Sequence, residues 1–218
     1  MTTARRTFTH AIALCLSVTC ATAQRCGTGG GTPGAFDYYV LALSWAPGFC
    51  DTATRPSARE CGPDRHLGFV VHGLWPQYEN GRSPEGCART PKVLPELVDR
   101  MLTLMRDPGL VQHEWACHGT CSGMTARDYF ATVDRAFQAV RVPEELRAPR
   151  HTTRVRIQDL ERRFADANRA SPDAFRAVCR GGELMEIRVC LTKDLRLRPC
   201  SSSVRECPAN QVTVLPIP

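Results

Sequence analysis

The chain has 218 residues, a formal net charge of +6 and 12 cysteines. This length suits one domain with a sizeable core. The mild positive charge is compatible with a polyanionic substrate, but it does not by itself indicate nucleic-acid binding, because most basic proteins bind none.

The first 23 residues have the pattern of a secretory signal. Two arginines precede an apolar run over 11–18, and an A-x-A cleavage site follows at 21–23. The apolar run is far shorter than the ~18 residues of a membrane span, so we expect no transmembrane helix. We expect the mature chain to begin at Gln24. A lipid anchor on Cys20 is the alternative, although the residues before it fit such a signal poorly.

Cleavage after residue 23 removes two of the 12 cysteines and leaves ten. It also removes two arginines and no acidic residue, so the net charge falls from +6 to +4. Ten cysteines in an exported chain of this size indicate disulfides rather than free thiols. We therefore expect a secreted or periplasmic protein that disulfides stabilise.

The first half of the mature chain has the composition of strands separated by loops. A Gly-rich arm over 24–34 leads into the domain, which we expect to occupy 35–218. β-Branched and aromatic residues predict buried strands over 36–45 and 67–74. The second strand is expected to end at Trp75-Pro76, because proline cannot donate a ladder hydrogen bond. The segments between and after these strands, which contain Cys50, Cys61 and Cys87, are expected to be loops over 48–62 and 77–91.

The second half of the chain alternates between helical and strand patterns. Apolar residues at helical spacing predict a helix over 95–106, with proline in its first turn. A capping box that opens at Thr125 predicts another helix as far as Val140. Further helices are expected over 113–121 and 160–170, and late strands over 174–178, 184–191 and 211–215. These patterns predict an α+β fold with a central, largely antiparallel sheet packed with helices.

The block 113–119 (HEWACHG) holds two histidines and one carboxylate. In a helix, residues four apart share a face, so Glu114 and His118 form an acid–imidazole pair. A neighbouring carboxylate raises the pKa of an imidazole and holds its orientation. The alternative is a surface ion pair without a catalytic role.

Zinc is a second alternative for this block. His113, Cys117, His118 and Cys121 could be drawn as its ligands. The expected export argues against this site, because cysteines in an oxidising compartment are more often bridged. The spacing also lacks paired C-x-x-C motifs.

The block 71–76 (VHGLWP) places His72 at the end of an apolar strand, beside a glycine that permits close backbone approach. Trp75 here and Trp115 in the other block could each stack on a base, which is worth ~1–3 kcal/mol per base; packing in the core is the alternative. Histidines from two blocks, each with an aromatic neighbour, indicate general acid–base catalysis on a flat ligand. Cleavage of RNA by its own 2′-hydroxyl requires this chemistry.

The sequences HGLWP (72–76) and HEWACHGTC (113–121) resemble the two active-site signatures of the ribonuclease T2 family. The segments 38–50, 127–137 and 186–200 also resemble its first strand, the helix after its second signature and its C-terminal strand. The resemblance therefore covers nearly the whole mature chain.

The resemblance implies a role for each residue of the two signatures. His118 is the general base that takes the proton of the 2′-hydroxyl, and His72 is the general acid that protonates the leaving 5′-oxygen. His113 binds the phosphate, Glu114 helps to stabilise the transition state or positions its neighbours, and Trp75 contributes to the substrate site. The products are 2′,3′-cyclic phosphates and then 3′-phosphates. The partner is RNA, mainly single-stranded, and no metal or other cofactor is needed. Nothing in the sequence demands an oligomer, so we expect a monomer.

The sequence departs from the family pattern at two positions. Cys117 stands where Lys or Arg usually precedes the last histidine, and losing a donor to the transition state could cost on the order of 10²–10³ in rate. A catalytically impaired RNA-binding protein is therefore the main rival, and a zinc hydrolase is the second. Gln77 stands where an Asp often occurs in members that recognise adenine or guanine. We include Gln77 and Trp115 among the candidate substrate-binding residues and leave base preference open.

The resemblance also implies four disulfides, which spacing alone could not select. They are Cys50–Cys61, Cys87–Cys121, Cys179–Cys207 and Cys190–Cys200. Cys26 and Cys117 remain, and we hypothesise that they pair and hold the Gly-rich arm over the catalytic helix; a free thiol at Cys117 is the alternative. His66 and His151 are expected to face solvent, the latter in a basic linker over 147–156.

Overall fold

A computed structural model describes residues 26–218 apart from 28–29 and 55–56. The expected signal segment, its cleavage site and the alternative lipid anchor on Cys20 lie outside these described residues. None of the helices in the described part combines the length and the apolar character that crossing a bilayer requires.

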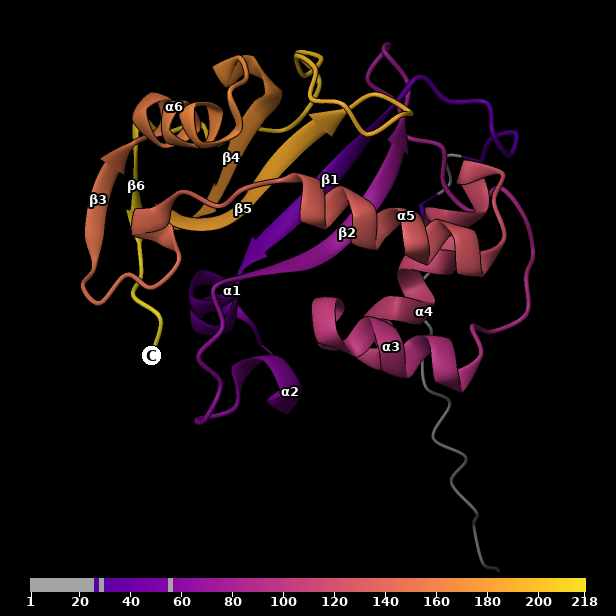
Figure 1. The fold of residues 1–218 in the computed structure, drawn as a ribbon, viewed down its shortest axis with the longest axis horizontal. Helices are drawn as coiled ribbons and strands as arrows, with labels where there is room; N and C mark the ends of the chain where they lie inside the picture. The colour runs from indigo at the N-terminus through magenta and orange to yellow at the C-terminus, as the bar shows by residue number, and fades with distance from the viewer. Residues whose placement is uncertain (1–25, 28–29, 55–56) are drawn as a thin grey trace, which may run out of the picture.

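The fold is built on one twisted sheet, which runs from β3 at the left of Figure 1 to β2 near its centre. Its order is β2-β1-β5-β6-β3, and β4 also pairs with β5. Every pairing is antiparallel except a single parallel contact between Glu183 of β5 and Thr213 of β6. The strands are β1 (Tyr38–Trp45), β2 (Phe69–Gln77), β3 (Thr153–Arg156), β4 (Phe175–Arg180), β5 (Glu183–Leu191) and β6 (Gln211–Val214). The expected α+β class with a largely antiparallel sheet is confirmed.

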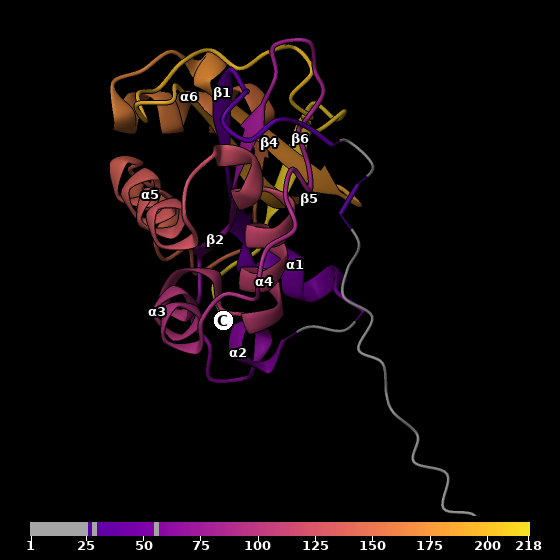
Figure 2. The same ribbon diagram turned by 90° about the vertical axis from the view of Figure 1, so that its right-hand side faces the viewer.

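Six α-helices accompany the sheet in the described part of the chain: α1 (Ala46–Thr52), α2 (Ala58–Cys61), α3 (Pro95–Met105), α4 (Pro108–Cys117), α5 (Ala126–Ala139) and α6 (Ile157–Asn168). Three 3₁₀ turns lie at Gly119–Ser122, Glu144–Leu146 and Pro172–Ala174. Helices α3, α5 and α6 lie on one face of the sheet (Figure 2). Thr125 caps α5 as expected, since its hydroxyl accepts a hydrogen bond from the Asp128 backbone N–H at 3.2 Å.

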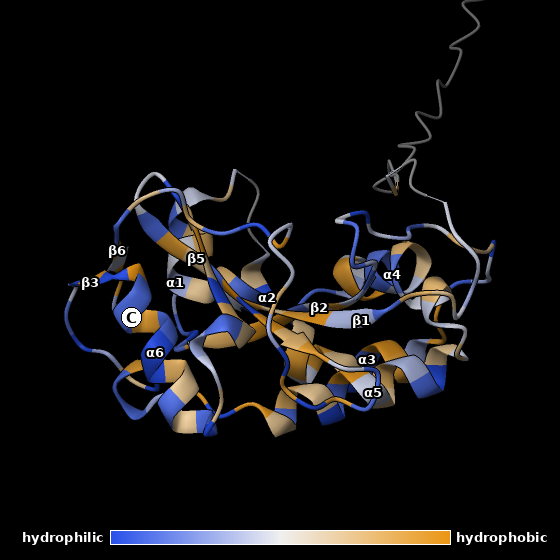
Figure 3. Ribbon diagram, turned by 90° about the horizontal axis from the view of Figure 1, so that it is seen from above, coloured by the Kyte–Doolittle hydropathy of each residue, from blue (hydrophilic) through white to orange (hydrophobic). Residues whose placement is uncertain are grey.

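The main hydrophobic core lies between the sheet and these three helices. Alternate residues of β1 enter it, namely Tyr39, Leu41, Leu43 and Trp45. Their neighbours Tyr38 and Val40 point to the other face, where they form a small cluster with Cys190 and Val204. Figure 3 shows the hydrophobic residues gathered along β1 and β2, and helices that carry both polar and apolar residues. The sheet face opposite the main core therefore carries a much smaller apolar cluster than the core face does.

Several expected boundaries are wrong, each for a local reason. Strand β2 continues through Pro76 because it is an edge strand, where a missing N–H need not break a ladder. Helix α4 begins at Pro108, earlier than expected, because the Asp107 carboxylate caps it by accepting from the Leu110 N–H at 2.8 Å. The predicted loop 48–62 contains α2 and most of α1, and the basic segment 147–156 ends in β3.

Five disulfides stabilise the described chain, and they are the five pairs named from the sequence. They are Cys26–Cys117, Cys50–Cys61, Cys87–Cys121, Cys179–Cys207 and Cys190–Cys200. The Gly-rich arm is held at several points. Cys26 is bonded to the last residue of α4, and the N–H of Gly27 donates to Glu85 at 2.7 Å. The N–H of Gly34 donates to the carbonyl of Cys121 at 2.9 Å.

Candidate active site

A β-bulge interrupts β2 at His72, which lies on the face of the sheet opposite the main core. Ala42 of β1 pairs with Gly73 and Leu43 pairs with Val71, so His72 has no partner residue on β1. Such an extra residue re-aims the side chains around it. Val71 enters the main core, whereas His72 lies on the opposite face. Because Leu74 after the bulge enters the main core as Val71 does before it, His72 and Trp75 both lie on the opposite face of the sheet.

Two residues of β5 lie on the same face as His72. Ile187 and Val189 enter the main core, so Glu186 and Arg188, which alternate with them, point the other way. The carboxylate of Glu186 accepts from His72 Nδ1 at 2.6 Å. Sequence reasoning did not identify these two residues. The alternation of polar and apolar residues along the predicted strand 184–191 was the signal that could have found them.

Glu114 extends from α4 toward β2, where it contacts Trp75 and His72. Its side chain is 1% exposed, and Oε2 accepts from the Trp75 indole N–H at 2.9 Å. Oε1 lies 3.8 Å from His72 Nε2. A Cβ on Gly73 would lie only 2.0 Å from Glu114 Oε2. Glycine at this position is therefore what allows the carboxylate to approach the strand.

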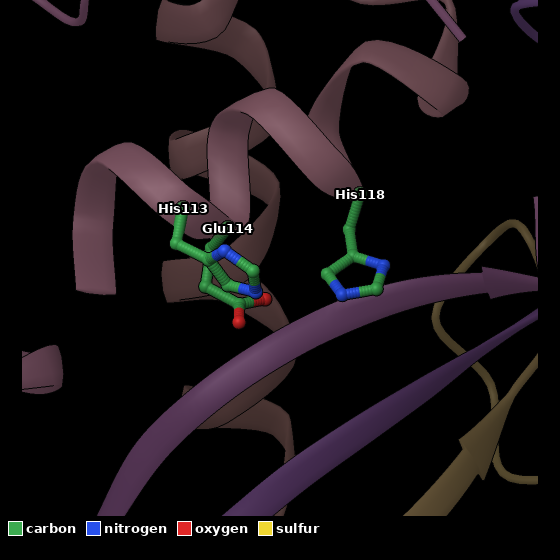
Figure 4. A group of neighbouring side chains, drawn as sticks. All are labelled: His113, Glu114 and His118. Atoms are coloured by element: carbon green, nitrogen blue, oxygen red, sulfur yellow. The ribbon is translucent and has the colours of Figure 1, made fainter. Parts of the chain in front are cut away.

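His118 follows the last residue of α4, and its backbone N–H donates to the carbonyl of Glu114 at 3.0 Å. Its ring centroid is 5.6 Å from that of Trp75, and the ring of His72 is 5.1 Å from the same indole. The ring of His113 lies 6.1 Å from that of His118. The side chains of His113, Glu114 and His118 extend together toward β2 (Figure 4). The structure thus gathers the candidate catalytic residues of both signatures around one tryptophan.

The surroundings of the two principal histidines have opposite effects on them. Burial lowers the pKa of His72, but the hydrogen bond to Glu186 and the charges of Glu114 and Glu186 outweigh it, so its pKa is raised. Burial, together with the charges of His113 and His72, lowers the pKa of His118 to about 3. These surroundings favour the protonated form of His72 more than water favours that of a free imidazole, whereas His118 is neutral above about pH 3.

The carboxyl of Glu114 also titrates unusually. Burial raises its pKa to about 7, against the opposing effects of the His72 charge and the Trp75 hydrogen bond. Oε1 of Glu114 and Nδ1 of His118 are buried, and neither has a hydrogen-bond partner within the described residues. A buried polar atom without a hydrogen-bond partner costs free energy. Such atoms are found where a ligand or a water molecule supplies the missing hydrogen bond.

Other sequence candidates lie elsewhere or are already engaged. Trp115 is 6% exposed and packs against Tyr129, with ring centroids 6.0 Å apart. It has no free face for a base, so it is a core residue and its expected substrate contact is wrong. The side-chain amide of Gln77 donates to the Pro76 carbonyl at 2.9 Å, and its oxygen accepts from Ser83 at 2.8 Å. Ser83 lines an open pocket of about 440 Å³ beside the Gly-rich arm.

The outlying histidines have no place in the site. His66 bonds to the carbonyl of Pro218, and His151 is exposed. Both histidines are exposed, in agreement with their expected solvent-facing positions.

A metal ion could contact only part of the set drawn from the sequence. Cys117 and Cys121 are both in disulfides, so the four-residue zinc site with His113 and His118 is wrong. The ligand atoms of His113, Glu114 and His118 do lie within 4.8 Å of one another. Two imidazoles and a carboxylate are ligands that zinc accepts. These residues also make up the proposed acid–base site, so a metal bound there would compete with its chemistry.

The amino-acid sequence is similar to those of two bacterial proteins. The "Probable ribonuclease" of Haemophilus influenzae is 39% identical over 122 residues, which are 50% of this chain and 45% of that protein. The "Ribonuclease" of Aeromonas hydrophila is 45% identical over 100 residues, 45% of this chain and 44% of that protein. The chain thus spans less than half the length of these two relatives.

A solved structure shares the fold. An RNase-related protein from Calystegia sepium matches with a TM-score of 0.66 and 22% identity, over 83% of this chain and 97% of that chain. The family model described as "Ribonuclease T2 family" matches residues 36–200, which include every candidate catalytic residue. The chain therefore belongs to the ribonuclease T2 family.

Proposed function

We propose that this protein is an endoribonuclease that cleaves RNA by attack of the substrate's own 2′-hydroxyl on the adjacent phosphate. The observation that carries this proposal is geometric: the rings of His72 and His118, which come from the two separate signatures, both lie against Trp75, at 5.1 Å and 5.6 Å. Acid–base catalysis of a single displacement needs one group that can accept a proton and one that can donate it. The environments of His118 and His72 favour these two forms at the same pH.

In the proposed first step, neutral His118 takes the proton of the 2′-hydroxyl while the 2′-oxygen forms a bond to phosphorus. The bond from phosphorus to the 5′-oxygen breaks, and protonated His72 gives its proton to that oxygen. The products are a 2′,3′-cyclic phosphate and a 5′-hydroxyl. In a slower second step, the two histidines exchange roles as water opens the cyclic phosphate to a 3′-phosphate. The nucleophile of the first step is a substrate oxygen, so that step requires no metal-bound water.

The remaining residues of the site support this displacement in the proposal. His113, beside His118, contacts the phosphate, and Glu114 stabilises the crowded phosphorus centre. Trp75 offers its ring to the substrate between the two imidazoles, because stacking on an aromatic ring binds a base without requiring a particular one. Cys117 is bonded to Cys26 and supplies no positive charge, so we expect a working but slower enzyme than members with a cation there.

We propose single-stranded RNA as the main substrate, because in-line attack requires a flexible backbone and accessible bases. The names of the Haemophilus and Aeromonas relatives support ribonuclease activity in general terms. Five disulfides support export to an oxidising compartment, as the N-terminal signal pattern does. We propose that the exported protein acts as a monomer, with one domain over 35–218.

Digestion of single-stranded RNA in EDTA tests the proposal. Mass spectrometry of the products should find 2′,3′-cyclic phosphate ends that convert slowly to 3′-phosphates. Tight RNA binding without cleavage would instead support the impaired binding protein. Cleavage that stops in EDTA and returns with zinc would support the metal-dependent rival. An exposed substitution such as His151→Ala is the matched control, since it removes a histidine far from the signatures and should leave the rate unchanged.

A further inference from the structure

Glu186 fixes which nitrogen of His72 is available for catalysis. Its Oε1 lies 2.6 Å from Nδ1 of His72. An ionised carboxylate can only accept, so Nδ1 carries the hydrogen of this bond. Nε2 then faces the site, where Glu114 Oε1 lies 3.8 Å away. A ring held in this way presents one nitrogen to the substrate whether it is protonated or neutral.

Glu186 is itself held rigidly. It lies on β5, between β1 and β4, where it pairs with Ser44 and Val178. Arg188 Nε donates to its second carboxylate oxygen at 3.2 Å. The side chains of Glu186 and Arg188 are only 12% and 19% exposed. A central strand and a second ion pair leave this carboxylate little freedom to move.

Arg188 links this pair back to the rest of the site. Its guanidinium carbon lies 5.2 Å from the centroid of the Trp75 ring, within the range of a cation–π contact. Trp75 in turn donates to Glu114. His72 is thus enclosed by a chain of contacts that runs from Glu186 through Arg188 and Trp75 to Glu114. Each of these side chains restricts the position of the side chain that it contacts.

Charged groups from three directions act on His72. Glu186 and Arg188 lie on β5, Glu114 on α4 with His118 just after it, and Glu60 on α2. Among them, the Glu186 carboxylate makes the shortest contact with the imidazole. Glu186 raises the pKa of His72, whereas the charge of Arg188 lowers it. These opposite signs make the two residues separable by experiment.

We propose, on the basis of the RNA cleavage proposed above, that Glu186 is a positioning residue for the general acid. By accepting the Nδ1–H bond of His72, it aims Nε2 at the leaving 5′-oxygen, and Arg188 holds Glu186 in that orientation. Neither residue takes or gives a proton in the displacement. Loss of Glu186 should therefore lower kcat, which depends on proton donation, more than it changes KM.

The first test is the Glu186→Gln variant, studied without RNA. An NMR titration of the His72 ring should show its pKa falling relative to the wild-type protein, because a neutral amide can accept the same bond but carries no charge. Arg188→Gln should move the pKa of His72 in the opposite direction. Glu145→Gln is the control: it removes a carboxylate that pairs with Arg163 at 3.4 Å on the surface, and it should cause no shift. General disruption of the fold would not produce shifts of opposite sign.

The second test is kinetic. Glu186→Gln should lower kcat by at least about 10-fold, within the ~10²–10⁴-fold that a general acid contributes, with KM nearly unchanged. The basic limb of the pH–rate profile should move to lower pH, and Glu186→Asp should recover part of the rate. An active Glu186→Gln variant with an unchanged His72 pKa and unchanged kcat would overturn the inference. A wild-type protein that cleaves no RNA would instead refute the proposed function, while the NMR shifts would still test the contact.

Discussion

Substitution of Gly73 by alanine tests the close approach between β2 and α4. The added methyl carbon would lie 2.0 Å from Glu114 Oε2 and 2.4 Å from Trp75 Nε1, where ordinary contacts are 3.4 Å or longer. Either the carboxylate or the strand must therefore move by more than 1 Å, and the 2.9 Å bond between Trp75 and Glu114 breaks. Overpacking costs about 1–3 kcal/mol, and leaving a buried partner unsatisfied costs about 1–3 kcal/mol more.

We therefore expect Gly73→Ala to lose about 2–6 kcal/mol of unfolding free energy in urea denaturation and to fall on the order of 10²-fold in RNA cleavage. A double-mutant cycle identifies the cause. In a Glu114→Ala background the carboxylate is absent and the Trp75 indole is released from its hydrogen bond, so the indole can shift and the added methyl should cost markedly less. Equal costs in both backgrounds, or a Gly73→Ala variant with wild-type stability and activity, would refute the reasoning.

Three further predictions follow from the charges and disulfides of the site. The profile of kcat/KM against pH should be broad, with its maximum at acidic to neutral pH. The value should fall below about pH 3, where His118 becomes protonated, and again as the pH rises through the raised pKa of His72. Activity confined to alkaline pH would contradict this prediction. The raised pKa of Glu114, about 7, means that the folded state holds this proton more tightly than the unfolded chain, so the fold loses stability as the pH rises from about 4.5 to about 7. Glu114→Gln should therefore be more stable than the wild type at pH 8, by about 3 kcal/mol, and equally stable at pH 4, while cleaving RNA poorly. A Glu114→Gln variant that is less stable at pH 8 would be inconsistent with this account. Peptide mapping without reductant should recover Cys26 joined to Cys117, and replacing both by serine should cost about 2–5 kcal/mol of unfolding free energy; alkylation of Cys117 in the unreduced protein would disprove the bond.

The sequence was most informative where one short segment carries the signal. The α+β class and the Thr125 cap followed from local patterns, because capping residues and apolar periodicity act within a few positions. The five cysteine pairs came from the family resemblance and, for Cys26, from elimination. Both signatures were recognisable as motifs before their geometry was known.

Long-range contacts account for what the sequence did not reveal. The bulge at His72 depends on its pairing with β1, and the continuation of β2 through Pro76 depends on its position at the sheet edge. Glu186 joins His72 across 114 positions of sequence, so no local pattern connects them. Trp115 looked equivalent to Trp75 in sequence, but the helix directs one ring into the core while the strand directs the other to the site.

The central claim is that His72 supplies a proton to the leaving oxygen and that His118 removes one from the nucleophile. An RNA substrate whose 5′-bridging oxygen is replaced by sulfur separates these roles, because a thiolate leaves without protonation. On this substrate the His72→Ala variant should recover most of the wild-type rate, whereas His118→Ala should stay as slow as it is on ordinary RNA. Recovery of His118→Ala alone, or equal behaviour of the two variants, would contradict the account.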